Sequence, residues 1–121
     1  CHSGSLTKRS FEPNAIGLIS IIREKHPETP LAVISPIISP EREDTRFFEN
    51  SLTLKEMREI LRIVVNKFKK YGDKNISYVD GLEILGADKL EYLPDNLHPD
   101  AKGQFIMAEN FINKVSNMIL W

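Results

Sequence analysis

A strand–helix–strand pattern in the middle of the chain limits the possible folds most strongly. Residues 31–34 form a short apolar run without alternation, which is typical of a strand buried on both faces of a parallel sheet. Residues 76–79 are expected to form a second short strand. Between them, residues 54–68 place apolar side chains on one helical stripe. The order predicts a right-handed parallel crossover in an α/β layered fold. The stripe consists of Leu54, Met57, Ile60, Leu61, Val64, Val65 and Phe68, and Lys55, Glu56, Arg58, Glu59, Arg62 and Lys69 are expected to face away from it.

Local signals set the limits of the helices. Thr53, with Glu56 three residues later, has the form of a capping box, and Gly72 supplies the turn that ends the helix. An earlier helix is expected from Asn14 to about His26, and residues 36–52 and 82–98 are expected to be mostly irregular. A last helix is predicted from about Pro99. Its expected buried face is Phe105, Ala108, Phe111, Ile112, Val115 and Ile119.

The number of strands is small for a sheet of this kind. A chain of 121 residues fits one domain, but two parallel strands leave an apolar sheet edge exposed, which proteins normally pair or cover. We therefore expect the chain to be the second half of a doubly wound domain. Either preceding sequence or a partner chain would complete the sheet, and a homo-oligomer that covers the edges is one way to do so.

Charge and hydropathy exclude several classes of partner. The 16 basic and 17 acidic residues nearly balance, which gives no reason to expect nucleic acid or an anionic membrane as partner. The longest nearly apolar run, residues 31–38, falls far short of the roughly 20 residues that span a bilayer. Small neutral substrates fit better. The single cysteine, Cys1, leaves the redox compartment open, and the cellular location is not determined.

Asp95 and His98 are the candidate catalytic residues. They lie three residues apart, after the last expected strand and just before a helix, where sites are built in open α/β sheets. A carboxylate beside an imidazole can orient the ring and stabilise its protonated form, so that His98 acts as a general base. On spacing alone this signal is weak, because an aspartate near a helix start is more often a cap and a lone loop histidine is usually a surface residue. A metal pair is a weaker alternative, because no third or fourth ligand follows at suggestive spacing.

The sequence around this pair resembles a known family. Asp95-Asn96-Leu97-His98-Pro99 followed by Gly103 resembles the carboxyl-terminal block of the SGNH, or GDSL-type, hydrolases. The family's preceding elements are similar to further segments, so that the likeness covers nearly the whole chain. These segments are Ile21–Pro27, Thr29–Leu31, Val33–Ile37 and Tyr78–Leu82. The likeness implies a flavodoxin-like three-layer α/β/α sandwich and hydrolysis of carboxylic esters through an acyl-enzyme, with no metal or organic cofactor. Asp95 would orient His98, and His98 would be the base.

The chain departs from that family at the nucleophile. No Gly-Asp-Ser occurs, and the glycine and asparagine blocks that complete the oxyanion hole are not recognisable. We therefore expect residues 1–121 to be the carboxyl-terminal part of a single hydrolase domain, with the serine upstream of Cys1 or on a second chain. The isolated chain would then be inactive. The rival hypothesis is a non-catalytic α/β fragment or interaction module that retains the Asp–His pair.

Two further segments carry alternatives. Ser3 and Ser5 flank a glycine but lack a preceding strand, so a terminal segment without a role explains them better than a nucleophile turn does. An amino-terminal nucleophile at Cys1 would leave Asp95 and His98 unexplained. The charged loop at residues 41–46, with Phe47 and Phe48, is interpreted as a solvated surface loop, with an acyl-pocket wall or a contact surface as the alternative.

Overall fold

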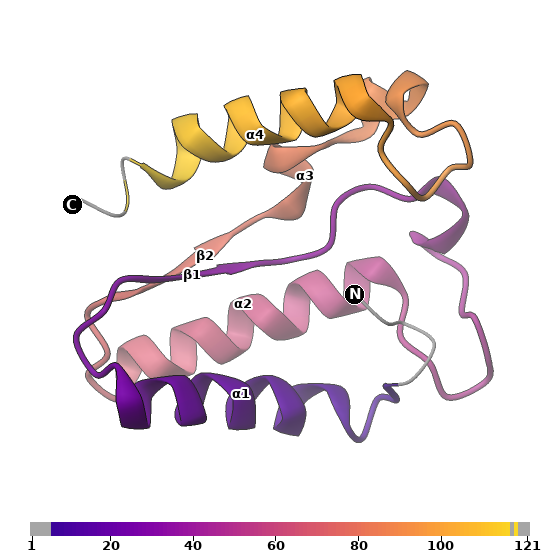
Figure 1. Ribbon diagram of the computed structural model, residues 1–121. Coiled ribbons are helices and arrows are strands. Elements are labelled where there is room, and N and C mark those ends of the chain that lie inside the picture. Colours follow the sequence, from indigo (N-terminus) through magenta and orange to yellow (C-terminus); the bar gives the residue numbers. More distant parts are fainter. Residues whose placement is uncertain (1–5, 117, 119–121) are drawn as a thin grey trace.

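The protein is described by a computed structural model that covers residues 6–116 and 118, and it has three layers (Figure 1). A two-stranded sheet lies in the middle, with helices α1 and α2 on one face and helices α3 and α4 on the other. The predicted α/β class is therefore confirmed, and the layers are compatible with an α/β sandwich. Cys1, His2, Ser3, Ser5, Ile119 and Trp121 lie outside the described residues.

The sheet consists of β1 (Leu31–Ile34) and β2 (Ile76–Val79), which run parallel. Leu31 pairs with Ile76 and Ile34 pairs with Val79, so both expected strands form at their expected positions. Alternate side chains point to opposite faces, as the period of a strand requires. Leu31 and Val33 pack towards α1 and α2, whereas Ala32 packs on the other side with the α3–α4 layer.

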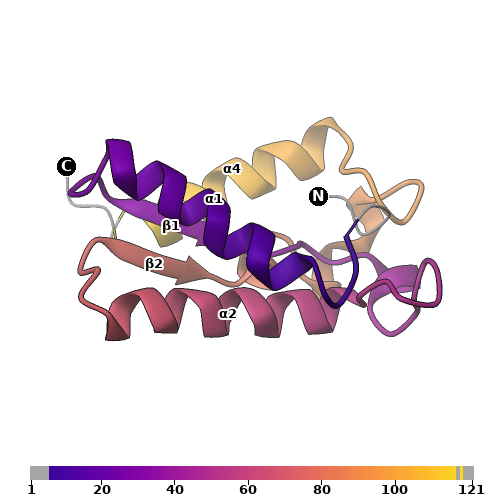
Figure 2. The ribbon, with the colours of Figure 1, turned by 90° about the horizontal axis from the view of Figure 1, so that it is seen from below.

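Helices α1 (Phe11–Lys25) and α2 (Leu54–Lys70) lie side by side under the sheet (Figure 2). Helix α1 begins three residues before the expected Asn14, because Pro13 falls in its first turn, where the missing N–H is not needed. The core between this layer and the sheet is built around Ile19, Val64, Val65 and Ile76.

The amino-terminal end of α2 follows the sequence prediction closely. The hydroxyl of Thr53 accepts the Glu56 N–H, and the Glu56 carboxylate accepts the Thr53 N–H, so the capping box is complete. Gly72, with a φ of 103°, adopts the left-handed conformation that follows the helix end. One expectation for this helix is wrong. Arg58 does not face solvent, and only 6% of it is exposed. Its side chain turns inward and donates to the backbone carbonyls of Pro36 and Ile37, in the loop that follows β1.

The opposite layer contains α3 (Gly81–Ile84), the 3-10 segment η2 (Ala87–Tyr92) and α4 (Ala101–Val115). Residues 82–98 are thus less irregular than expected. The buried face of α4 was mispredicted except at Val115: Met107 and Val115 pack against the sheet and α3, and Gly103 is buried against Tyr92 and Pro99. The residues that were expected to be buried but are exposed are Phe105, Ala108, Phe111 and Ile112.

Both outer edges of the sheet lack a further strand within residues 6–116. There, β1 pairs with β2 alone, and Ile34 at its end is 39% exposed, so β1 is less buried than the apolar run suggested. Among the described helices, none is both long enough and apolar enough to cross a membrane.

Because β1 and β2 run parallel, the segments that follow the two strands lie at the same end of the molecule (Figure 1).

Candidate functional site

Asp95 and His98 contact each other in the loop before α4. Oδ2 of Asp95 lies 2.6 Å from Nδ1 of His98, which is the arrangement expected from their spacing. The other carboxylate oxygen, Oδ1, accepts the backbone N–H groups of Leu97 (3.0 Å) and His98 (2.6 Å). Both side chains are open to solvent, with 54% of Asp95 and 75% of His98 exposed. The pair is therefore fixed by hydrogen bonds of the turn rather than by burial.

A left-handed residue makes this turn possible. Asn96 has a φ of 59° and is the one non-glycine residue with positive φ in the described part of the chain. Asparagine tolerates this conformation better than most residues do. Its N–H donates to Leu93 O at 2.9 Å, and Leu93 is buried, so the turn is anchored to the interior.

The electrostatics of the turn fix the roles of the two groups. The backbone N–H of His98, then its imidazole, and more weakly the Leu97 N–H lower the pKa of Asp95 from 3.8 to about 2. The carboxylate is then ionised at neutral pH and can only accept hydrogen bonds. Nδ1 of His98 must therefore carry the proton between them, which leaves Nε2 as the lone-pair nitrogen of the neutral ring.

Helix α4 starts directly behind the pair. Asp100 caps it, with its carboxylate accepting the Gly103 N–H at 2.7 Å, and the Asp100 N–H donates to Tyr92 O. A Cβ at Gly103 would lie 3.0 Å from Cβ of Tyr92 and 3.1 Å from Cβ of Pro99, so glycine allows the helix to pack closely there. The helix start thus fixes the backbone just after His98.

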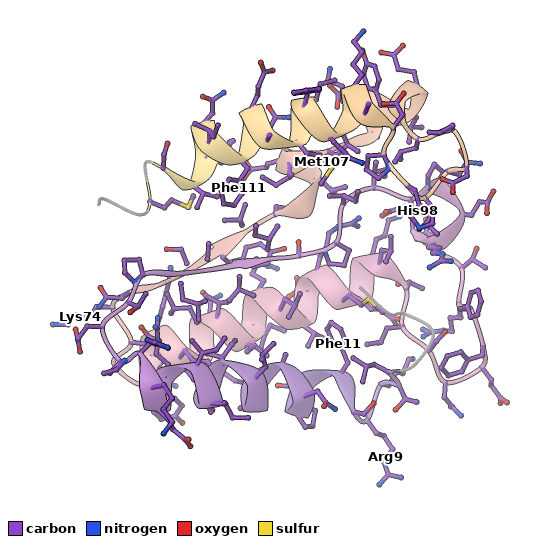
Figure 3. All side chains as sticks on the ribbon, in the orientation of Figure 1. Arg9, Phe11, Lys74, His98, Met107 and Phe111 are labelled. Carbon is purple, nitrogen blue, oxygen red and sulfur yellow. The ribbon has the colours of Figure 1, made fainter. Side chains whose placement is uncertain are left out.

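A cavity of about 880 Å³ opens beside His98. It is bounded by α1, α2, the loop after β1 and the His98 loop, and His98 is labelled at that end of the molecule in Figure 3. Most lining groups are apolar, which suits a neutral organic ligand. The lining includes Phe11, Leu18, Ile34, Ile38, Met57, Leu97 and Met107.

Two serines line the same cavity, and each is engaged elsewhere. Ser39 is buried and donates its hydroxyl to Asn96 O at 2.8 Å. The buried Ser35 hydroxyl accepts the Tyr78 hydroxyl and the Gly81 N–H, both at 3.0 Å. Among the described residues, the hydrogen-bond partner of the His98 ring is Asp95, and no serine contacts Nε2. The nucleophile is therefore not assigned to any described serine.

The charged loop after β1 is more than a solvated surface. Phe47 is 67% exposed, in agreement with the surface interpretation, but Glu43 forms a nearly buried ion pair with Arg58 at 2.7 Å. Burial pushes the pKa of Glu43 up, but hydrogen bonds from Arg58 and the Ser39 N–H, with the Arg58 and Lys55 charges, bring it below 4.5. Sequence reasoning missed this pair because neither helical periodicity nor composition signals a contact across 15 residues.

Within residues 6–116 and 118, no group of three or more His, Cys, Asp and Glu side chains is placed to hold a metal ion. Asp95 and His98 lie together without a further ligand of that kind among these residues.

Comparisons with known proteins gave an informative similarity among solved structures. No family model matches the chain, and no curated protein matches it. A solved structure that it resembles is described as a salicylyl-acyltransferase, SsfX3, from a tetracycline biosynthetic pathway. The two share 31% sequence identity with a TM-score of 0.78 over 91% of this chain. The matched region is 32% of the acyltransferase chain, so this chain spans about a third of that protein's length.

These findings correct the family expected from the sequence. The assignment to the SGNH or GDSL-type hydrolases is wrong on these comparisons, because no family model supports it and the matching structure is described as an acyltransferase. The physical reason lies in the motif itself. The block from Asp95 to Pro99 encodes a local turn that holds a carboxylate against an imidazole, and such a turn does not specify a family. What the comparison supports is the fold and the general kind of reaction, acyl transfer, catalysed by the neighbour.

Proposed function

We propose that this chain carries the acid–base half of an acyl-transfer site, in which Asp95 orients His98 and His98 is the general base. The observation that carries the proposal is the 2.6 Å contact between Asp95 Oδ2 and His98 Nδ1. It leaves Nε2 available on an exposed ring at the rim of an apolar cavity. The likeness to an acyltransferase supports the same reaction class.

The chemistry proposed is acyl transfer from a carboxylic ester through an acyl-serine. Nε2 of His98 removes the hydroxyl proton as the serine oxygen attacks the ester carbonyl, and it then gives that proton to the departing alcohol. In the second half, Nε2 takes a proton from water or from an acceptor alcohol, which attacks the acyl-serine. The proton returns to the serine oxygen as it leaves. Asp95 stabilises the imidazolium in both halves.

The serine is proposed to come from polypeptide other than residues 6–116, on the same protein or a partner chain. Ser35 and Ser39 support this view, because their hydroxyls are committed to Tyr78, Gly81 and Asn96. The acyl part of the substrate is proposed to be apolar, in keeping with the lining of the cavity beside His98.

Two outcomes of the second half remain to be separated. Transfer to water makes the protein an ester hydrolase, and transfer to an alcohol makes it an acyltransferase. The exposed His98 ring favours access of water, and the named activity of the structural neighbour favours an organic acceptor. A radiolabelled acyl ester offered with and without an acceptor alcohol distinguishes them by the ratio of free acid to new ester.

The proposal is tested with a fluorophosphonate probe on the natural gene product that contains these 121 residues. One serine should be labelled, and the labelling rate should fall at least about a hundredfold in His98→Ala. His26→Ala is the matched control, because His26 ends α1 and is exposed. A folded natural gene product with no labelled serine would favour the non-catalytic interaction module instead.

A further inference from the structure

We infer that Ser39 and Glu41, on the loop after β1, are positioning residues for His98, and that Arg58 holds this loop in place. The inference rests on the proposed role of His98. The loop runs from Ser35 to Glu43 and includes the short 3-10 segment η1 (Pro40–Arg42). It lies beside the His98 loop, at the end of the molecule where His98 is labelled in Figure 3.

Asn96 is the point at which the two loops are joined. The Ser39 hydroxyl donates to Asn96 O at 2.8 Å, and the Asn96 side-chain amide donates to the Glu41 carboxylate at 3.0 Å. These two bonds hold Asn96, whose left-handed backbone conformation brings Asp95 and His98 together. A change in that backbone angle would move the carboxylate relative to the ring, because only two residues separate them.

The bonds matter because the pair has little packing of its own. With 75% of His98 and 54% of Asp95 exposed, surrounding side chains restrict the ring weakly. In the described part of the chain, the hydrogen bonds that reach residues 95–98 from other elements of the fold come from Ser39 and Glu41. They are therefore the main non-local hydrogen-bond restraint on the orientation of His98.

Arg58 makes the loop a firm support. From α2 it donates to Pro36 O at 2.8 Å and to Ile37 O at 3.0 Å, and it forms a two-pronged pair with Glu43. The Glu43 carboxylate in turn accepts the Ser39 N–H at 3.3 Å. The side chains of Arg58 and Glu43 are 8% and 12% exposed, so the pair is shielded from water.

The test compares two buried serines in the natural gene product. Ser39→Ala and Ser51→Ala each remove a hydroxyl that donates to a backbone carbonyl at 2.8 Å, but Ser51 bonds Phe48 and not a residue of the His98 loop. Ser39→Ala should lower kcat for a chromogenic ester about tenfold with KM within about twofold, and Ser51→Ala should change neither. Equal kcat values in the two variants would overturn the inference.

A second pair of variants covers the case in which Ser39→Ala does not fold. Glu41 is exposed, so Glu41→Ala should leave the fold intact. It should lower kcat about threefold, and Glu41→Gln should restore it, because the glutamine carbonyl still accepts from Asn96. A loss that Glu41→Gln does not restore would contradict the positioning role.

A spectroscopic readout separates this inference from the proposed function. Long-range ¹H–¹⁵N spectra of the His98 ring should show the Nδ1-protonated tautomer in the wild type and a tautomer mixture in Ser39→Ala. If His98→Ala keeps full activity, the proposed function fails, while a tautomer change in Ser39→Ala still supports the positioning of His98. Unchanged ring signals in both Ser39→Ala and Glu41→Ala would overturn the positioning role even if His98 proves essential.

Discussion

Asp95 directs both of its carboxylate oxygens into the turn that holds His98: Oδ2 lies 2.6 Å from the imidazole Nδ1, while Oδ1 accepts the N–H groups of Leu97 and His98. One carboxylate thus shapes the backbone and orients the ring. A single side chain does both in the structure, but substitutions of Asp95 can separate its effect on the backbone from its effect on the imidazole.

Replacing Asp95 by asparagine should keep the turn and lose the charge. In Asp95→Asn the amide oxygen can still accept a backbone N–H, but the imidazolium loses its anionic partner, so kcat should fall by about 10²–10⁴-fold. Ester turnover measures the loss, with Asp88→Asn as the control, because Asp88 pairs with Lys89 at the surface. A loss of less than about threefold would mean that the charge is not used.

The pKa of Asp95 predicts how the turn responds to acid. Because it is lowered from 3.8 to about 2, the stabilisation of the turn is complete above pH 3.8 and is lost as the pH falls through about 2. Titration of the Asp95 carboxylate should therefore make no contribution to the amide chemical shifts of Leu97 and His98 between pH 7 and 5. A carboxylate titration at Asp95 centred above pH 4 would contradict the hydrogen bonding described here.

The capping box of α2 should give a second acid-sensitive contribution. Hydrogen bonds from Arg46 and from the Thr53 N–H are the main causes that lower the pKa of Glu56 from 4.5 to about 2. Glu56→Gln keeps the cap but loses the charge, and it should cost about 0.5–1 kcal/mol at pH 7, because the site is about one-third exposed. The difference in unfolding free energy should persist down to pH 4.5 and vanish as the pH approaches 2. Glu59→Gln, at an exposed ion pair, should cost less.

Arg58 should be one of the most sensitive polar residues for stability. Arg58→Met leaves Glu43 without its partner and two carbonyls without their donor, and it should lower the free energy of unfolding by about 3–5 kcal/mol. Arg62→Met on the same helix is the control, since its ion pair with Glu59 is exposed and should contribute little to stability. Urea denaturation of both variants measures the difference, and similar midpoints would refute the buried role of Arg58.

Gly81 should not tolerate a side chain. A Cβ there would lie 2.2 Å from Ser35 O and 2.3 Å from Pro36 O, which are backbone atoms that cannot move aside easily. Gly81→Ala should therefore destabilise the protein by about 3 kcal/mol or more. Gly17→Ala, in α1 with nothing within 4 Å, should instead stabilise it by about 0.5–1 kcal/mol. Thermal unfolding of the two variants should shift the midpoint in opposite directions.

The parts of the fold that could be predicted depend on local signals. The capping box at Thr53, the turn at Gly72 and both strands follow from neighbouring residues, and the structure has them in place. The buried face of α4 could not be predicted in the same way. Phe105, Ile112 and Val115 have the spacing of a core stripe, yet of these three only Val115 is buried. Helix α4 packs through Gly103 and Met107 as well, because the position of the neighbouring layer decides which face is covered.

The candidate site also has a contact that could be predicted from the sequence and contacts that could not. Asp95 and His98 are three residues apart, so their contact could be expected from spacing, although their catalytic role is still a proposal. The bond from Ser39 to Asn96 spans 57 residues, and the pair of Arg58 and Glu43 depends on the inward turn of a helix residue expected to face solvent. Contacts of this kind leave no pattern in a single sequence.

Turnover of a short-chain chromogenic ester by His98→Ala, measured beside His26→Ala in the natural gene product, tests the central claim most directly. We predict that kcat/KM falls by about 10²–10⁴-fold in His98→Ala, while His26→Ala stays within about twofold of the wild type. If both variants hydrolyse or transfer the acyl group at the wild-type rate, His98 is not the base and the Asp95–His98 contact is only a feature of the turn before α4.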